Sequence, residues 1–281
     1  MKRLVFCWSL CWFLLAGCIR EPNVTPGGAR QVVVFFSTKS LSASSLKSTG
    51  NESENLIAKI ILFGVDDQNN VVQTFPAMGN PPIAGIQLTI SGNVKTLYAI
   101  ANPSATLEAA TPINVSDLMA LTDNFTNAPQ SPLLMSGQAD IIGYNVNIEL
   151  VRAVAKIIVS GEDGFDVQSV TVKNTPAKGF VFAQATLTVP SNERVTYPEN
   201  SNTPVYVAEN SKQNPATLTV KGIVHGQPVD VDVFFVINGA LVDIVRNNSY
   251  SVVIGSSGTA YNITITIRDW DDQEIDKHYF D

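Results

Sequence analysis

Few residues in this chain could do covalent or acid–base chemistry. The three cysteines, Cys7, Cys11 and Cys18, lie near the start of the sequence, and the two histidines are His225 and His278. A Ser-His-Asp triad would need one of these histidines, and the chain has no G-x-S-x-G turn to present the serine. It also lacks the H-E-x-x-H pattern that places two zinc-binding histidines on one helix face. The sequence therefore predicts neither an enzyme nor a metal or cofactor site.

The residues around Cys18 predict that its thiol is modified. The charged triplet MKR and an apolar run that ends at Gly17 are together typical of a secretory signal. The run is shorter than the roughly 20 residues of a membrane-spanning helix. Its end, LAGC, is similar to a bacterial lipobox, in which cleavage between Gly17 and Cys18 precedes acylation of the cysteine. We expect residues 1–17 to be the signal and Cys18 to carry the lipid, with Ile19 favouring outer-membrane delivery. An ordinary signal peptide with a chance cysteine is the alternative.

Two acidic clusters have the residue types of a calcium or glycan site. RDWDD, residues 268–272, places three carboxylates around Trp270. Calcium takes roughly 6–8 oxygen ligands, so three acids at a strand end fit a solvated terminus better, with Trp270 in the core. GVDDQNN, residues 64–70, lacks the EF-hand spacing, and its Asp and Asn residues favour a hairpin turn. We expect no metal at either cluster.

Composition narrows the class of protein. The net charge is −7, only 15% of residues are charged and 45% are apolar. Nucleic-acid binding draws most of its affinity from phosphate neutralisation, so an acidic chain with few lysines argues against it. The apolar content argues against disorder. The length of 281 residues suits two domains.

Short β-strands dominate the expected secondary structure. Residues 18–30 hold Pro and Gly without periodicity and indicate a flexible tether. The run QVVVFFS, residues 31–37, predicts a strand buried on both faces, and a Ser- and Asn-rich segment up to residue 55 predicts a flexible loop. Leu118, Leu121 and Phe125 recur at helical spacing and predict one short helix over residues 114–125.

The second half indicates β-sandwiches, because its short strands are separated by Gly, Pro and Asn turns every 8–12 residues or so. We place an N-terminal domain at residues 31–149 and a C-terminal domain at residues 150–281. Arg152 and Arg246 lie in apolar surroundings. We expect them to form salt bridges at the domain interface, with Glu149 or Asp243 as possible partners.

Several segments stand in an order that resembles the fimbrillin family, the subunits of type V pili in Bacteroidales bacteria. The segments, after the lipobox and first strand, are AKIILF, LYAIANP, DLMALTDNF, PLLMSGQA, LVRAVAKIIV, VYVAEN, VRNNSYSVVI and IRDW. The resemblance implies two transthyretin-like Greek-key β-sandwich domains and export as a lipoprotein. It also implies assembly by strand exchange. A protease cuts after the first strand, that strand leaves, and a partner's segment fills the groove.

The exchanged strand would present five apolar side chains, those of Val32, Val33, Val34, Phe35 and Phe36. The C-terminal region is the segment that the family commonly donates. Here it reads DDQEIDKHYFD, a weak donor in which Ile275, Tyr279 and Phe280 could fill pockets.

The chain departs from the family pattern at the expected protease cleavage site after the first strand. Shaft subunits of the family typically carry an Arg in the loop, whereas residues 37–55 offer only Lys39 and Lys47. Arg30 lies before the strand, so a cut there would remove the lipid and leave the strand in place. Three outcomes stay open. Another protease cuts near Lys47; or the subunit is cut only at Arg30 or is otherwise not prepared as a shaft acceptor; or it stays uncut and lipidated and serves as an anchor or accessory.

We therefore expect a structural fimbrial subunit at the cell surface that mediates adhesion. Its partners would be other fimbrial subunits, the outer membrane through Cys18, and host or bacterial surface ligands. A glycan-binding β-sandwich lipoprotein outside any pilus is the alternative. Sugar platforms usually use exposed Trp and Tyr, and Trp270 is the only Trp after the signal.

Overall fold

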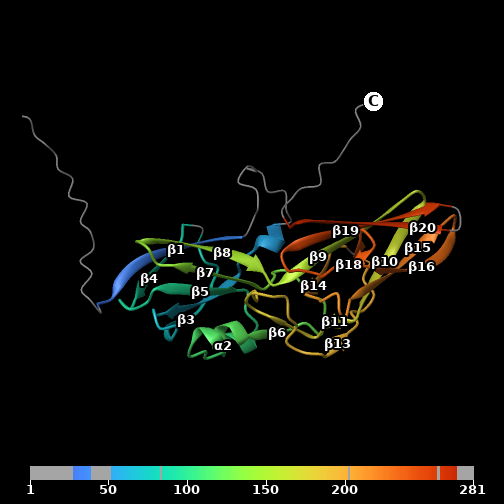
Figure 1. Ribbon diagram of the computed structural model, residues 1–281. Helices are drawn as coiled ribbons and strands as arrows, with labels where there is room; N and C mark the ends of the chain where they lie inside the picture. The colour runs from blue at the N-terminus through green and yellow to red at the C-terminus, as the bar shows by residue number, and fades with distance from the viewer. Residues whose placement is uncertain (1–27, 39–51, 83, 202, 258–259, 271–281) are drawn as a thin grey trace, which may run out of the picture.

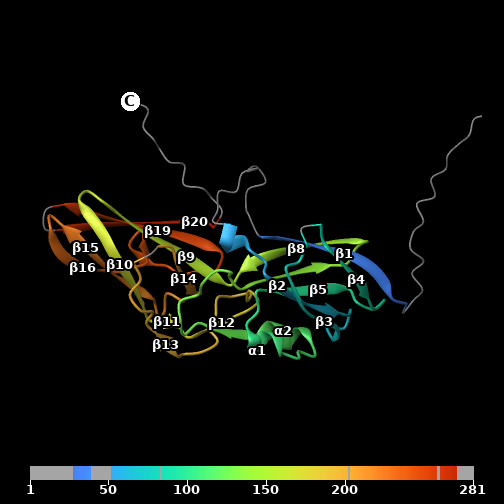
Figure 2. The same cartoon turned by 180° about the vertical axis from the view of Figure 1, so that it is seen from behind.

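The computed structural model describes residues 28–38, 52–82, 84–201, 203–257 and 260–270. Within these residues the chain is almost entirely β. Two short α-helices, α1 (Ala105–Glu108) and α2 (Val115–Ala120), and one 3-10 turn, η1 (Glu52–Asn55), interrupt the strands. Figures 1 and 2 show an elongated molecule with β1 to β8 toward one end and β9 to β20 toward the other. The predicted all-β sandwich class is confirmed.

The N-terminal half forms one continuous order of seven strands, β3-β2-β5-β7-β8-β1-β4. Their bounds are β1 (Arg30–Thr38), β2 (Lys59–Val65), β3 (Val71–Gly79), β4 (Ile86–Ile90), β5 (Thr96–Ala101), β7 (Met135–Asp140) and β8 (Asn145–Arg152). The link from β7 to β8 is short, with only Met135 opposite Arg152 and Ser136 opposite Val151. The strands on the two sides of this short link form two layers, β3-β2-β5-β7 and β4-β1-β8.

One hydrophobic core joins these two layers into a sandwich. Val32 and Ile148 from one layer and Leu62 and Leu97 from the other have no exposed side-chain surface and belong to the same cluster. Burying such apolar surface is the main force that holds two sheets face to face.

The layer β3-β2-β5-β7 is also covered on its outer face. Phe63 and Ile100 point away from the first core and pack with Leu107 of α1 and Leu118 of α2. The long apolar runs of β2 and β5 reflect this double burial.

The helix predicted over residues 114–125 is shorter than expected, and α1 is an additional one. Asn114 caps α2 by accepting a hydrogen bond from the Asp117 amide at 2.9 Å. The backbone becomes extended at Leu121 (φ −60°, ψ 133°). The following residues form β6 (Thr122–Asn124), which pairs with β12 (Lys178–Phe180). Strand pairing with the second half therefore ends the helix early.

The C-terminal half is a second sandwich. One layer is β14-β9-β19-β20 and the other is β10-β15-β16, with a shared core that includes Ile157, Val220 and Val252. The strands are β9 (Val154–Glu162), β10 (Phe165–Lys173), β11 (Thr175–Pro176), β13 (Arg194–Val195), β14 (Val205–Ala208), β15 (Thr217–Val224), β16 (Gln227–Phe234), β17 (Val236–Ile237), β18 (Ala240–Leu241), β19 (Asn248–Ser257) and β20 (Ala260–Asp269).

The two halves repeat one feature and share one core. In each half the first strand runs parallel to a later one, β1 beside β8 and β9 beside β19. Val181, Phe182 and Ala208 of the second half pack into the same cluster as the outer face of β2 and β5. Strand β8 of the first sandwich ends at Arg152, and strand β9 of the second begins at Val154. The division into domains at residues 149 and 150 stays a prediction.

The turns agree with the sequence. His225 and Gly226 have φ values of 49° and 77°, which the two-residue hairpin between β15 and β16 requires, and His225 is exposed. Asp66 accepts hydrogen bonds from the Gln68 and Asn70 amides at 2.9 and 2.8 Å in the β2–β3 turn. Both residues are thus accounted for by local turn structure.

Candidate functional site

The first strand lies inside a sheet and pairs along both of its edges. β1 runs antiparallel to β4, with Arg30 opposite Ile90, and parallel to β8, with Thr38 opposite Leu150. Val32 and Val34 have no exposed surface, and Phe36 packs against the same core. Strand β1 therefore fills a groove whose walls are the edges of β4 and β8.

Burial of β1 is mainly one-sided, contrary to the prediction of burial on both faces. Val33 and Phe35 point away from the core and are only half-buried. The polar outward residues of β8 explain this, since Asn145, Asn147 and Glu149 are exposed on that side. Three inward apolar side chains together contribute about 5–9 kcal/mol at most, at roughly 1.5–3 kcal/mol each.

Arg30 lies within β1 rather than before it. Its guanidinium donates a hydrogen bond from Nη2 to the Val94 carbonyl at 3.0 Å, and its backbone pairs with Ile90. Proteases cleave exposed, locally unfolded segments, so a cut at Arg30 would require the start of β1 to open first.

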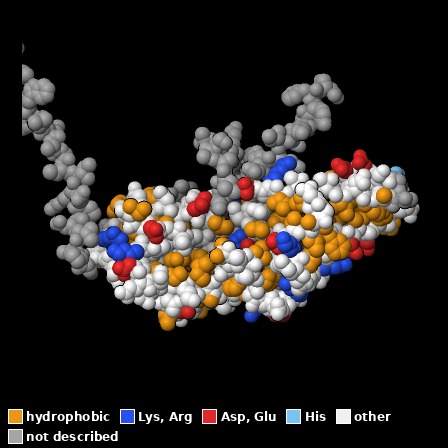
Figure 3. Space-filling model, viewed as in Figure 1, with side chains coloured by type: hydrophobic (Ala, Val, Ile, Leu, Met, Phe, Trp, Pro, Cys, Tyr) orange, Lys and Arg blue, Asp and Glu red, His pale blue; other side chains and the backbone are white. Residues whose placement is uncertain are grey.

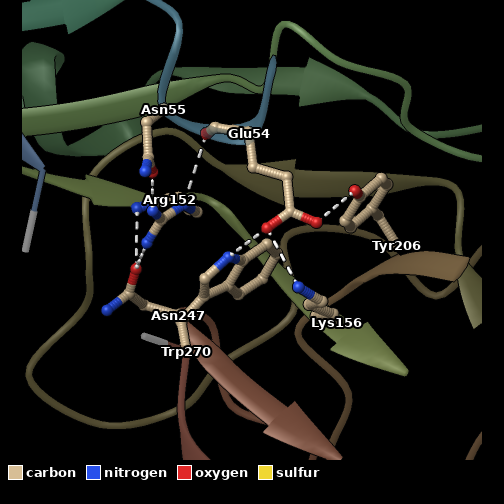
Figure 4. Close-up of polar contacts among 7 residues, drawn as sticks. All are labelled: Glu54, Asn55, Arg152, Lys156, Tyr206, Asn247 and Trp270. Atoms are coloured by element: carbon tan, nitrogen blue, oxygen red, sulfur yellow. Dashed lines mark hydrogen bonds and ion pairs between the residues drawn. The ribbon is translucent and has the colours of Figure 1, made fainter. Parts of the chain in front are cut away.

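Residues 39–51, which include Lys39 and Lys47, lie outside the described residues, and the chain is described again from η1 onward. Glu54 in η1 is a carboxylate that is only 2% exposed. It accepts hydrogen bonds from Tyr206 Oη at 2.7 Å, Trp270 Nε1 at 2.9 Å and Lys156 Nζ at 3.0 Å. These partners come from β14, the end of β20 and β9 (Figure 4).

Arg152 lies beside Glu54 and is fully buried at the end of β8. Its Nη1 donates to Asn247 Oδ1 at 2.9 Å, and its Nη2 donates to Asn55 Oδ1. The guanidinium also stands over the ring of Trp270, 4.7 Å from the centroid, a cation–π arrangement.

We call these residues the junction cluster because they join the two halves of the chain. Trp270 stacks on Tyr206 with a centroid distance of 5.7 Å and an interplanar angle of 10°. The cluster consists of Glu54, Asn55, Arg152, Lys156, Tyr206, Asn247 and Trp270. Strand β1 contributes no side chain to this set.

The junction cluster holds Glu54 in its charged form. Burial alone would raise the pKa of the carboxyl, but hydrogen bonds from Tyr206, Lys156 and Trp270 outweigh burial and lower its pKa. Burial and the neighbouring Glu54 carboxylate together raise the pKa of Tyr206. Tyr206 therefore remains a donor to Glu54 at any physiological pH.

The structure brings together some of the predicted residues and adds others. Trp270 is buried, as expected, and its neighbours give it a structural role. Arg246 forms its ion pair with Glu209 at 2.7 Å, a partner that the sequence did not indicate. Glu54 was also missed, because it lies in a Ser- and Asn-rich segment predicted to be a flexible loop.

Other predicted sites lie outside the described residues. These are the signal at 1–17, Cys18, the processing candidates Lys39 and Lys47, and the donor candidates Ile275, Tyr279 and Phe280. Among the residues that the structure does describe, no group of three or more His, Cys, Asp or Glu could hold a metal ion. In that same part, no helix is long and apolar enough to cross a membrane.

The chain belongs to the family of fimbrillin-A associated anchor proteins Mfa1 and Mfa2, whose model matches residues 62–276. This is a family of structural fimbrial proteins, which associates the chain with cell-surface fimbriae and with other fimbrial subunits. No curated protein matches the chain significantly.

Solved structures share its fold at low sequence identity. The tip fimbrial protein Mfa3 from Porphyromonas gingivalis, with a C-terminal truncation, has a TM-score of 0.59 at 14% identity, covering 86% of this chain and 100% of that one. A fimbrial assembly protein from Parabacteroides distasonis has a TM-score of 0.59 at 15% identity, covering 88% and 98%. The fimbrial anchor protein Mfa2 from Porphyromonas gingivalis has a TM-score of 0.50 at 12% identity, covering 86% and 98%.

Proposed function

We propose that this protein is an anchor or accessory subunit of a cell-surface fimbrium, exported as a lipoprotein and held at the outer membrane by acylated Cys18. Family membership supports the fimbrial part of this proposal. The sequence LAGC supports the lipid part. A triacylated cysteine has more than the single chain that gives only marginal membrane binding.

Chain order links the lipid to the first strand. Cys18 and β1 both precede residues 39–51, so one cut in that segment would leave the lipid and the strand on the same fragment, separate from the rest of the chain. A subunit that keeps its lipid must therefore keep β1, unless the strand is displaced without cutting. Lipid anchoring and an emptied β1 groove are alternative states of the same chain.

The complete seating of β1 is the observation that carries the proposal. Val32 and Val34 are fully buried, both edges of the strand are paired, and Arg30 is bound within it. The uncut chain thus closes its own groove and needs no strand from a neighbour. That is the state expected of an anchor that stays attached to its lipid.

Strand exchange at β1 is the second candidate, and the junction cluster favours it. The contacts of Glu54 and Arg152 involve η1, β8, β9, β14 and the ends of β19 and β20, without β1 side chains. The two halves would therefore stay joined if β1 left and a partner's strand entered between β4 and β8. Such a strand would gain main-chain pairing on both edges and pockets for alternate side chains.

The C-terminal segment is the proposed donor toward a neighbouring subunit. Trp270 fixes the start of that segment at the junction cluster, and Ile275, Tyr279 and Phe280 follow it. Adhesion would then be a property of the assembled fimbrium. The glycan-binding alternative is weakened because Trp270, at 5% exposure and stacked on Tyr206, presents no sugar platform.

Acylation of Cys18 can be tested in cells. We expect labelled palmitate to enter the wild-type protein and not the Cys18→Ala variant, which should appear in the medium or periplasm. A Ser37→Ala variant is the matched control and should be labelled normally. Retention of Cys18→Ala in the outer membrane without label would contradict lipid anchoring.

A further inference from the structure

The turn between β7 and β8 exposes an apolar pair near the N-terminal end of the molecule. Ile142 is 95% exposed and Tyr144 is 49% exposed. No other large hydrophobic side chain in the described part of the chain is as exposed as Ile142.

The backbone holds this turn in place at both of its ends. The Ile141 amide donates to the Lys95 carbonyl at 2.7 Å, and the Val33 amide donates to the Tyr144 carbonyl at 2.8 Å. Ile141 itself is buried. Ile142 is therefore presented outward by a fixed turn that is bonded to β1.

The outer face of β1, which is bonded to this turn through the Val33 amide, adds two half-buried apolar side chains. A Cβ placed on Gly85 would lie 2.8 Å from Val33 Cγ1 and 2.9 Å from Phe35 Cε1, so these two half-buried side chains lie together on one side of the strand. We call Val33, Phe35, Ile142 and Tyr144 the turn patch. Figure 3 shows hydrophobic side chains at the surface of this end of the molecule. Single exposed hydrophobics are ordinary, whereas four on neighbouring segments indicate an interaction surface.

The charges around the turn patch have both signs. Lys95 and Arg30 lie at this end, together with Asp66 and Asp140, and Asp140 accepts a hydrogen bond from Thr96 Oγ1 at 2.7 Å. Charges of both signs at this end do not favour an ionic partner of one sign. Recognition by the turn patch must be mainly apolar.

The chain enters the fold beside the turn patch. Its described part starts at Gly28, five residues before Val33, and nine residues separate Gly28 from Cys18. An extended chain spans at most about 3.6 Å per residue, so acylated Cys18 would keep Gly28 within roughly 36 Å of the bilayer. Tethering at this range gives a surface near Gly28 a high effective concentration of lipid.

We propose that the turn patch rests on the lipid surface of the outer membrane, with Ile142 at the boundary of headgroups and acyl chains and Tyr144 at headgroup level. Tyr suits that position because its ring is amphipathic. The inference rests on the proposed acylation of Cys18. The patch orients the anchored subunit and turns the β9–β20 half away from the membrane, toward the fimbrium.

A single-site label tests this orientation directly. Cys18 is the last cysteine in the sequence and acylation blocks its thiol, so Ile142→Cys introduces one reactive thiol for an environment-sensitive dye. The lipidated protein is placed in vesicles of phosphatidylethanolamine and phosphatidylglycerol with nitroxide-labelled lipid. We expect the dye emission to shift to shorter wavelength and to be quenched by the nitroxide, with little dependence on salt.

Ile223→Cys is the matched control, because Ile223 is an exposed isoleucine in the β15–β16 hairpin at the opposite end of the molecule (Figure 1). Its dye should keep the emission seen in water. Water-like emission at position 142 in protein that floats with the vesicles would overturn the turn-patch inference and leave lipid anchoring intact. Protein that fails to float would overturn the anchoring proposal and the inference with it. Burial of the label only after another fimbrial subunit is added would assign the patch to a protein interface and contradict the proposal.

Discussion

Glu54 is the residue on which the junction of the two halves depends most. It accepts hydrogen bonds from three elements that are far apart in the sequence, and its charge faces Lys156 at 3.0 Å. A buried carboxylate is costly unless it is paired and hydrogen-bonded, so losing this charge leaves Lys156 without its counter-ion.

Replacement of Glu54 by Gln should destabilise the protein at neutral pH by about 2–3 kcal/mol, somewhat less than for a fully buried ion pair because Lys156 retains some solvent access. Thermal unfolding measures the change. The matched control is Glu199→Gln, which removes a Lys221 ion pair of 2.7 Å that is solvent-exposed, and we expect little change there. Equal effects of the two substitutions would contradict a special role for Glu54.

The pH dependence of stability should carry the signature of Glu54. Its folded-state pKa is lower than the ordinary value of 4.5, so its contribution is fully present above pH 4.5 and is lost as the pH falls through the folded-state pKa. Wild-type protein should therefore lose stability more steeply than Glu54→Gln over that acidic range. Parallel unfolding curves for the two proteins across this range would argue against a lowered pKa.

At the scale of elements, β1 is held by two strand edges and by its inward side chains. Val34→Ala should lower the free energy of unfolding by about 2–3 kcal/mol, because it deletes buried methyl groups and leaves a cavity. Val33→Ala, on the half-buried face of the same strand, should cost less than about 1 kcal/mol. Chemical denaturation of both variants compares the faces, and a larger effect at Val33 would mean that the register of β1 is different.

Cutting the chain behind β1 tests how firmly the strand is seated. A specific protease sequence is placed within residues 42–48, and the folded protein is cut there. We expect the β1 fragment to stay bound after cutting, since pairing with β4 and β8 and burial of Val32 and Val34 are unchanged. Size-exclusion chromatography followed by intact mass would show both fragments together. Immediate loss of the N-terminal fragment would show instead that β1 is poised to leave.

Local patterns in the sequence predicted the strands well and their surroundings less well. The run QVVVFF predicts β1 because its residues are β-branched or aromatic. The same run cannot show that the outer face of β8 is polar, which leaves Val33 and Phe35 half-buried. The early end of α2 depends on β12, a strand more than 50 residues further along.

The junction cluster was beyond prediction for a related reason. Glu54 meets Tyr206 and Trp270 across 152 and 216 residues, so neither short periodicity nor composition signals the contact. The segment before Glu54 is rich in Ser and Asn and indicates a loop. Nothing in that pattern indicates a buried carboxylate at the end of the segment. The hydrogen-bonding turn at Asp66 depends on adjacent residues, and it was predicted correctly.

At the scale of the whole molecule, three features follow one another along its length. The turn patch belongs to the N-terminal end, β1 closes the first sandwich, and the junction cluster joins that sandwich to the second. Trp270 connects the C-terminal segment to the same junction. The central claim is that the mature subunit keeps its lipid and its first strand together.

Intact mass and N-terminal sequencing of the protein recovered from outer membranes and from shed fimbriae test this claim most directly. We expect a lipidated chain that begins at Cys18 and fractionates with membranes. A start at Gln31 without lipid mass would mean that the strand is kept while the anchor is lost. A new N-terminus between Ser37 and Asn55, with no β1 fragment recovered beside it, would mean that β1 and the lipid are removed together. That result would contradict the anchor proposal and favour a subunit that polymerises by strand exchange.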